Sequence, residues 1–210
     1  MTYKHIIFDV DGTMIDTECA ILYAFQETLN TLTGKTFPLE ELKFCFGNTV
    51  EASLRRFGIE EIRPAMNLWV QNVYHFADKV RVFDGIYDLL NELTASGYCL
   101  GVVTSETRNE LTLNFQHFGL DKYFGTTICM EDAYASKPDP APLFRYMELE
   151  HAKTSELLFI GDSHYDARCA KSAGVRFALA AWGSSAGTIQ ADYTLTHPLD
   201  LLTILNELDP

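Results

Sequence analysis

Acidic side chains follow apolar segments directly at two places in this sequence. Asp9 and Asp11 come straight after the segment HIIF, and Asp162 comes after the segment LLFIG. Carboxylates held close together resist ionising at the same time, because each negative charge raises the pKa of the other. A protein that places such acids at rigid strand ends therefore requires a cation to compensate them.

Two hydroxyls, a lysine and a further acid stand near the ends of other predicted strands or in the loops that follow them. Thr104 and Ser105 follow a third apolar segment, Lys137 stands in the proline-braced stretch SKPDP, and Asp166 follows Asp162 by four residues. With the first two acids they would form a cluster of four carboxylates and one ammonium, with a net charge of −3. Such a pocket repels an anionic substrate unless a divalent cation is bound, and carboxylates together with a phosphate suit Mg²⁺. The cluster predicts a Mg²⁺ site for phosphoryl transfer.

Apolar, strand-like segments alternate with amphipathic helical segments over most of the chain. The expected strands are residues 4–8, 98–104, 126–130, 157–161 and 176–182. The expected helices between the later strands are residues 85–96, 107–118, 140–149 and 164–173. We expect Asp84 to cap the first of these helices and Gly97 to end it.

This alternation predicts the α/β class, with a Rossmann-like parallel sheet flanked by helices. Nearly continuous apolar strands are typical of a parallel sheet that is covered on both faces. Ligands of such sheets bind beyond the carboxyl ends of the strands, so the polar residues above are expected to share one edge.

The segment 16–80 departs from the alternation. It contains helical stretches at residues 17–32, 49–57 and 61–78 and no convincing strand. We therefore predict an α-helical cap domain, residues 16–80, inserted after the first strand. The Rossmann-like catalytic core would consist of residues 1–15 and 81–210.

Composition and charge narrow the choice of partners. The 210 residues carry a formal net charge of −13 at pH 7. Nucleic acids and acidic membranes require clustered Lys and Arg, so we expect neither as a partner. No apolar run approaches the roughly 18 residues of a membrane span, and no signal pattern opens the chain. Five scattered cysteines favour reduced, mostly buried thiols in a cytoplasmic protein. We expect the protein to be a monomer or a weak homodimer.

Four short motifs stand in order along the chain. They are Asp9-x-Asp11-Gly12-Thr13, Thr104-Ser105, Lys137-Pro138 and Gly161-Asp162-x-x-x-Asp166. In this order they resemble the motifs of the haloacid dehalogenase-like hydrolase superfamily. The helical insert after the first motif is similar to that of the phosphoglycolate phosphatase and β-phosphoglucomutase branch. The resemblance implies Mg²⁺-dependent hydrolysis of a small phosphorylated metabolite through an aspartyl-phosphate intermediate.

The resemblance also implies a role for each motif residue. Asp9 would be the nucleophile, and Asp11 would protonate the leaving oxygen and later deprotonate the attacking water. Thr104 and the main chain around Ser105 would bind the phosphoryl oxygens. Lys137 would bridge the phosphate and the nucleophile.

The implied metal ligands are the side chains of Asp9 and Asp162 and the carbonyl of Asp11. Asp166 would position the waters of the metal or Lys137. The remaining candidates for substrate binding are Gly12, Thr13, Asn48 and Thr49, the last two in a cap loop that faces the active site in relatives.

Other interpretations remain open. The stretch DVDGT by itself is also a common acidic turn. β-Phosphoglucomutases carry a cap arginine and a histidine where a gapless alignment gives Val50 and Ile21 here, so hydrolysis is favoured over a phosphosugar mutase. A non-catalytic regulatory protein, such as a receiver-like domain, also clusters acids, a hydroxyl and a lysine, but lacks so long a helical insert. Sugar phosphates, phosphoglycolate, pyrophosphate and nucleotides all remain possible substrates.

Overall fold

A computed structural model describes residues 2–47, 49–183 and 189–208 of the chain. The candidate Asn48 lies outside these described residues. The chain divides into two compact units. One unit comprises Met1–Ile15 and Val82–Pro210, and the other comprises Asp16–Arg81.

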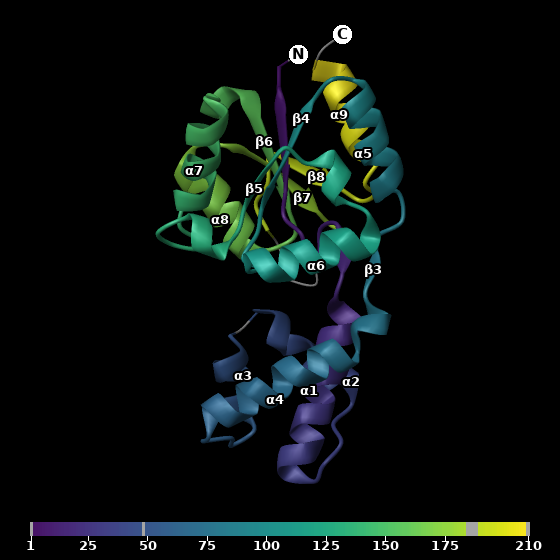
Figure 1. The fold of residues 1–210 in the computed structure, drawn as a ribbon, viewed down its shortest axis with the longest axis vertical. Coiled ribbons are helices and arrows are strands. Elements are labelled where there is room, and N and C mark those ends of the chain that lie inside the picture. The colour runs from purple at the N-terminus through teal and green to yellow at the C-terminus, as the bar shows by residue number, and fades with distance from the viewer. Residues whose placement is uncertain (1, 48, 184–188, 209–210) are drawn as a thin grey trace. The chain divides into compact units, whose positions relative to one another are not determined.

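The first unit is built on a six-stranded sheet with the order β5-β4-β1-β6-β7-β8 (Figure 1). Its strands are β1 His5–Phe8, β4 Cys99–Val103, β5 Thr126–Ile128, β6 Leu157–Gly161, β7 Arg176–Ala180 and β8 Tyr193–Leu195. All pairs of neighbouring strands are parallel, as predicted. The edge strand β8 was not predicted, because three residues of mixed polarity do not stand out from a loop.

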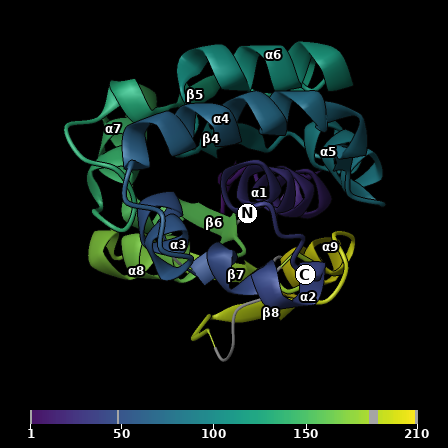
Figure 2. The same cartoon turned by 90° about the horizontal axis from the view of Figure 1, so that it is seen from below.

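Helices cover both faces of this sheet. They are α5 Ile86–Ala95, α6 Arg108–Phe118, α7 Ala141–Glu150, α8 His164–Ala173 and α9 Asp200–Leu208. Helices α7 and α8 contact each other on one side of the sheet, and α5 contacts α9 on the other (Figures 1 and 2). Every residue of β1 and β6 is buried, as expected for central strands with both faces covered. The predicted α/β architecture is confirmed.

Local capping explains where several helices begin. Helix α6 starts at a capping box formed by Thr107 and Glu110, and α8 starts at a second one formed by Ser163 and Asp166. The prediction of Asp84 as the cap of α5 is wrong. The N-cap there is Gly85, whose φ of 86° is a left-handed conformation that glycine adopts without strain.

The second unit is helical. Its helices are α1 Glu18–Thr33, α2 Leu39–Leu42, α3 Val50–Arg56 and α4 Ile62–His75, followed by a short 3₁₀ turn, Ala77–Lys79. Helix α4 packs along α1, as Figure 2 shows. The core residues of the unit are Leu22, Phe25, Leu29, Leu42, Leu54 and Ala65. The unit therefore has a hydrophobic core of its own.

Two short strands form the connections to this unit. They are β2 Ile15–Asp16 and β3 Arg81–Val82, which pair with each other in a two-stranded sheet. Asp16 accepts a hydrogen bond from Arg81 Nε at 3.1 Å and pairs with the same guanidinium. The segment that enters the helical unit and the segment that leaves it are thus bonded to each other.

All five cysteines are free thiols. The expectation that most of them are buried is wrong, since only Cys129 and Cys169 are buried while Cys19 and Cys99 are exposed. None of the helices in the described part of the chain has the length and apolar character needed to cross a membrane.

Candidate active site

The register of the central strands brings the predicted motifs to one edge. Phe8 of β1 lies opposite Val102 of β4 and Ile160 of β6. The residues that follow these strands therefore leave the sheet side by side at its carboxyl edge. Asp9 continues the ladder, donating its main-chain N–H to the Ile160 carbonyl at 2.9 Å.

A tight turn follows Asp9 and depends on Gly12. The N–H groups of Thr13 and Met14 both donate to the carbonyl of Val10, and the Gly12 N–H donates to Ile15 at 2.8 Å. Gly12 has a φ of 74°, a region that favours glycine. A Cβ atom at Gly12 would lie 2.4 Å from Asp162 Oδ2, so no larger residue fits without moving that carboxylate. The turn thus brings the first and last motifs into contact.

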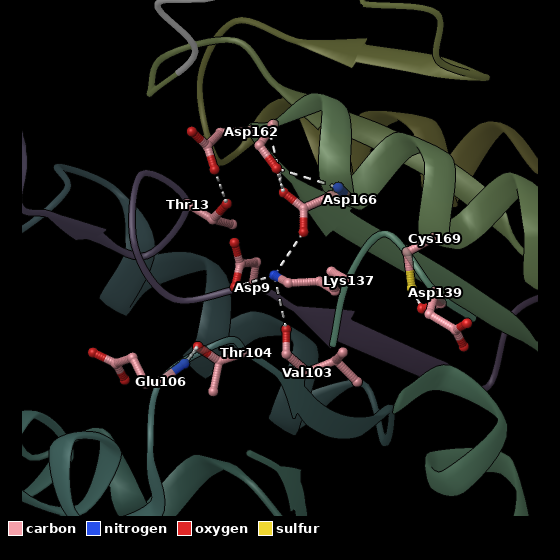
Figure 3. A network of polar contacts seen from close by, with 11 residues as sticks. Asp9, Thr13, Val103, Thr104, Glu106, Lys137, Asp139, Asp162, Asp166 and Cys169 are labelled. Carbon is pink, nitrogen blue, oxygen red and sulfur yellow. Dashed lines mark hydrogen bonds and ion pairs between the residues drawn. The ribbon is translucent and has the colours of Figure 1, made fainter. Parts of the chain in front are cut away.

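Lys137 lies at the centre of the cluster (Figure 3). Its side chain is 4% exposed, and its Nζ lies 2.7 Å from Asp9 Oδ1 and 2.6 Å from Asp166 Oδ1. The same ammonium donates to the Val103 carbonyl at 3.4 Å. Burial alone would lower the pKa of Lys137, but the charges of Asp166 and Asp9 raise it above its ordinary value. Lys137 therefore stays charged and joins three separate segments of the core.

Asp166 has two partners. Its Oδ1 pairs with Lys137, and its Oδ2 accepts the Ser163 N–H at 3.1 Å as part of the α8 capping box. The residue is fully buried. The helix start thus fixes the carboxylate that holds the lysine, and Ser163 is a supporting residue that the sequence analysis did not single out.

Asp162 is held from the side of the first motif. Thr13 is fully buried, and its hydroxyl donates to Asp162 Oδ1 at 3.4 Å (Figure 3). The carbonyl of Thr13 accepts from Trp182 Nε1 at 2.9 Å. Thr13 was predicted to contact the substrate. In the structure it lies inside the site, and its hydroxyl donates a hydrogen bond to the carboxylate of Asp162.

The two acids that face the site have perturbed pKa values. Burial, followed by the charge of Asp166, raises the pKa of Asp9 to about 7 in spite of Lys137. Burial, followed by the charge of Asp9, raises the pKa of Asp162 to about 8. One lysine is thus too little positive charge for these carboxylates.

This donor set fits a hard divalent cation. Asp9, Asp162 and Asp166 each offer a carboxylate oxygen, and these three atoms lie within 4.8 Å of one another. Oxygen ligands of this kind suit Mg²⁺, and its charge would relieve the repulsion that raises the pKa values of Asp9 and Asp162. The main chain of Asp11 forms a bridge with Ile15 in the same turn. The carboxylates of Asp9, Asp162 and Asp166 therefore form a cluster that could hold such a cation.

The second motif lies beside the lysine. Thr104 is 4% exposed, follows Val103 directly, and accepts the Glu106 N–H on its hydroxyl oxygen at 3.1 Å. Ser105 is exposed. The cap of α6 is Thr107, so neither Thr104 nor Ser105 serves as the N-cap.

Sequence reasoning missed Glu106, although it follows the second motif directly. Figure 3 shows it next to Thr104. Burial, followed by the charge of Asp11, raises the pKa of Glu106 to about 9.

Thr49, a predicted substrate contact, lies in the helical unit. It is exposed, and its hydroxyl oxygen caps α3 by accepting the Ala52 N–H at 3.2 Å.

Comparison with known proteins agrees with this geometry. The model of the family described as haloacid dehalogenase-like hydrolase matches residues 6–180, a span that contains all four motifs. The chain belongs to this family. The haloacid dehalogenase-like assignment makes it a hydrolase, and the matched span includes Asp9, Lys137 and Asp166, whose charges the structure pairs.

Relatives of this haloacid dehalogenase-like chain include proteins with different names. It is 27% identical over 214 residues to the pyrophosphatase PpaX of Bacillus mycoides (strain KBAB4), covering 100% of both chains. A putative phosphoglycolate phosphatase from Lactobacillus plantarum superposes with a TM-score of 0.84 at 31% identity, covering 97% of this chain and 100% of that one. A putative β-phosphoglucomutase from Thermotoga maritima shares the fold, with a TM-score of 0.80 at 18% identity over 98% of this chain and 99% of that one.

Proposed function

We propose that the protein is a Mg²⁺-dependent phosphomonoester hydrolase that acts on a small phosphorylated metabolite through an aspartyl-phosphate intermediate. The observation that carries the proposal is the buried Lys137 ammonium between Asp9 and Asp166, with Asp162 beside it at the carboxyl edge of the sheet. The names of the pyrophosphatase and phosphoglycolate phosphatase relatives support phosphate chemistry.

The first half-reaction forms the covalent intermediate. An oxygen of Asp9 attacks the phosphorus, an Asp9–phosphorus bond forms, and the bond from phosphorus to the ester oxygen breaks. Asp11 gives a proton to the departing oxygen, which leaves as an alcohol. Lys137 fixes the nucleophile through its 2.7 Å contact with Asp9 Oδ1 and offers positive charge to the phosphoryl group. Thr104 and the main chain at Ser105 hold phosphoryl oxygens.

The second half-reaction releases phosphate. Asp11, now a carboxylate, takes a proton from a water molecule that attacks the phosphorus, and the bond to Asp9 breaks. Mg²⁺, when bound by Asp9, Asp162 and the Asp11 carbonyl, supplies the positive charge that lets these acids accept an anionic ester. Asp166 positions Lys137, and Thr13 orients Asp162 through its hydroxyl.

Gly12 was predicted to bind substrate, but its N–H already donates to the Ile15 carbonyl. We propose that its role is to let the main chain of the first turn lie close to the Asp162 carboxylate. Five free thiols support a reducing, cytoplasmic environment. The acidic net charge of −13 supports a small-molecule substrate over a nucleic acid or a membrane. We propose a monomer or a weak homodimer.

The test is phosphate release from an aryl phosphate with Mg²⁺ and with EDTA, for the wild type, Asp9→Asn and a control, Asp121→Asn. Asp121 is exposed, so the control makes the same change away from the site. We expect Mg²⁺-dependent release by the wild type and the control, and none by Asp9→Asn. Robust turnover by Asp9→Asn would reject Asp9 as the nucleophile. Mg²⁺-dependent phosphate binding without turnover in the wild type would favour a regulatory protein instead.

A further inference from the structure

Glu106 has a carboxyl oxygen that the proposed reaction leaves unused. Its Oε1 accepts a hydrogen bond from Asn114 Nδ2 at 2.6 Å. Its Oε2 is buried, and no residue in the described ranges hydrogen-bonds it. Buried polar atoms in native proteins almost always have partners, so such an atom calls for an explanation. A bound substrate would provide one.

The main chain of Glu106 is fixed beside the phosphate-binding segment. Its N–H donates to the Thr104 hydroxyl oxygen at 3.1 Å, and its carbonyl accepts from Met130 N at 2.9 Å. Figure 3 shows the carboxyl group of Glu106 projecting away from Lys137. The residue is thus held at the site, while its side chain does not belong to the Lys137 cluster.

The charges around Glu106 indicate which side of the site it occupies. Asp11 acts on the Glu106 carboxyl more strongly than Asp9 does. Glu106 is thus within electrostatic reach of Asp11, the proposed donor of a proton to the leaving oxygen, and its main chain is bonded to Thr104. Glu106 therefore belongs to the part of the site that receives the leaving group.

In segment 104–110, all of which the structure describes, no cation is free to bind a second anionic group. Glu110 adds another negative charge near Glu106. The nearest cation along this segment is Arg108, and its guanidinium is engaged by Asp132 and by Thr127, whose carbonyl it reaches at 3.0 Å. Among the described residues of segment 104–110, the side chains near Glu106 therefore provide carboxyl oxygens rather than positive charge.

We propose that Glu106 Oε2 hydrogen-bonds a hydroxyl of the leaving group, so that the enzyme selects phosphomonoesters of neutral, hydroxylated alcohols over those whose leaving group is anionic. This inference rests on the proposed function. A hydroxyl donates and accepts, so it pairs with a carboxyl group in either protonation state. A carboxylate on the leaving group can only accept, so it can pair with Glu106 only when Glu106 is protonated, and its negative charge would face the charge of Glu110.

A matched series of two-carbon esters tests the inference. Initial rates with Mg²⁺ are compared for 2-hydroxyethyl phosphate, ethyl phosphate and phosphoglycolate, which differ only in the group that would face Glu106. We expect kcat/KM for 2-hydroxyethyl phosphate to exceed each of the others by about tenfold or more, because a site that hydrogen-bonds a hydroxyl discriminates against an analogue that lacks it.

Variants assign the preference to Glu106. In Glu106→Ala the ratio of 2-hydroxyethyl to ethyl phosphate should fall towards one, mainly through KM. Glu106→Gln keeps the shape and an oxygen that can accept from Asn114, so it should keep part of that ratio while phosphoglycolate gains about fivefold or more. Glu92→Gln makes the same substitution at an exposed position on α5 and should change neither ratio. Far-UV circular dichroism checks that each variant is folded.

The outcomes separate this inference from the proposed function. If the wild type shows no preference for 2-hydroxyethyl phosphate, or if both Glu106 variants keep the wild-type ratios, the inference is overturned. Mg²⁺-dependent release from an aryl phosphate would still support the proposed function in that case. If Glu106→Ala fails to fold, the phosphoglycolate ratio of Glu106→Gln decides. Absence of release from every ester, including the aryl phosphate, would refute both.

Discussion

Removing the charge of Lys137 should destabilise the fold in a pH-dependent way. Lys137→Met replaces the ammonium by an apolar side chain of similar length. It leaves the carboxylates of Asp9 and Asp166, whose side chains are 10% and 0% exposed, without their cation. Breaking a buried ion pair by removing one partner costs about 3–5 kcal/mol. Because two carboxylates share this lysine, we expect a loss in that range at pH 8.

Protonation should relieve most of the loss. Without the lysine, the pKa of Asp9 in the folded protein rises further above its unfolded value of 3.8. An acid with a raised folded pKa stabilises the fold at low pH and loses that contribution as pH rises through the folded pKa. The free-energy difference between Lys137→Met and the wild type should therefore shrink at pH 5.

Urea unfolding in EDTA at pH 5 and pH 8 measures this effect, with the free energy of unfolding taken from the midpoint and the slope. Lys171→Met on α8 is the matched control, because that lysine is exposed and its removal should change the free energy by less than about 0.5 kcal/mol. Adding Asp9→Asn to Lys137→Met should recover part of the loss. A loss below about 1 kcal/mol at pH 8, or an equal loss at both pH values, would refute the reasoning.

Three further predictions concern the acids and the first turn. Asp11→Asn should hydrolyse esters slowly and accumulate phosphoenzyme when the leaving group is good, which intact-protein mass spectrometry detects; unchanged turnover would remove its role as acid and base. Without metal, stability should fall as pH rises from about 4 to 8, by about 1.4 kcal/mol per unit of pKa shift, because the folded pKa values of Asp9 and Asp162, about 7 and about 8, exceed the unfolded value of 3.8. Mg²⁺ should then raise Tm more at pH 8 than at pH 5, and equal increases would contradict this account. Gly12→Ala should cost about 1–3 kcal/mol and weaken Mg²⁺ binding measured by calorimetry, because its Cβ would meet the Asp162 carboxylate. Gly97→Ala is the control, because Gly97 has a similar φ of 81° and a Cβ there would meet nothing within 4 Å, so it should show only the backbone strain. Equal Mg²⁺ affinities for the two variants would refute the effect of the contact between the new Cβ and Asp162.

The sequence was sufficient to predict the architecture and the edge at which chemistry would take place. Apart from His5, the residues of β1 and β6 are apolar, and such strands are typical of a sheet covered on both faces. Asp9 and Asp162 stand directly after these strands, so a parallel arrangement brings them to one edge. These conclusions depend on local pattern and on the geometry of parallel sheets, which a sequence displays.

Local pattern did not identify every cap. Asp84 has a suitable side chain, yet α5 begins after Gly85 in a left-handed conformation. Thr104 and Ser105 have the side chains of a cap, yet α6 is capped by Thr107. At α6 the capping box of Thr107 and Glu110 sets the start, and at α5 the left-handed backbone of Gly85 does so.

Only the tertiary structure decided how the charges of the site are paired. The sequence placed Lys137 in the predicted cluster, but only the structure shows its ammonium buried between Asp9 and Asp166, which come from segments far apart in the chain. Asp166 completes the capping box of α8 and holds that lysine, while Glu106 keeps a buried oxygen without a partner in the described chain. Burial and charge pairing depend on which distant segments fold against one another. They therefore cannot be predicted from the spacing of residues along the chain.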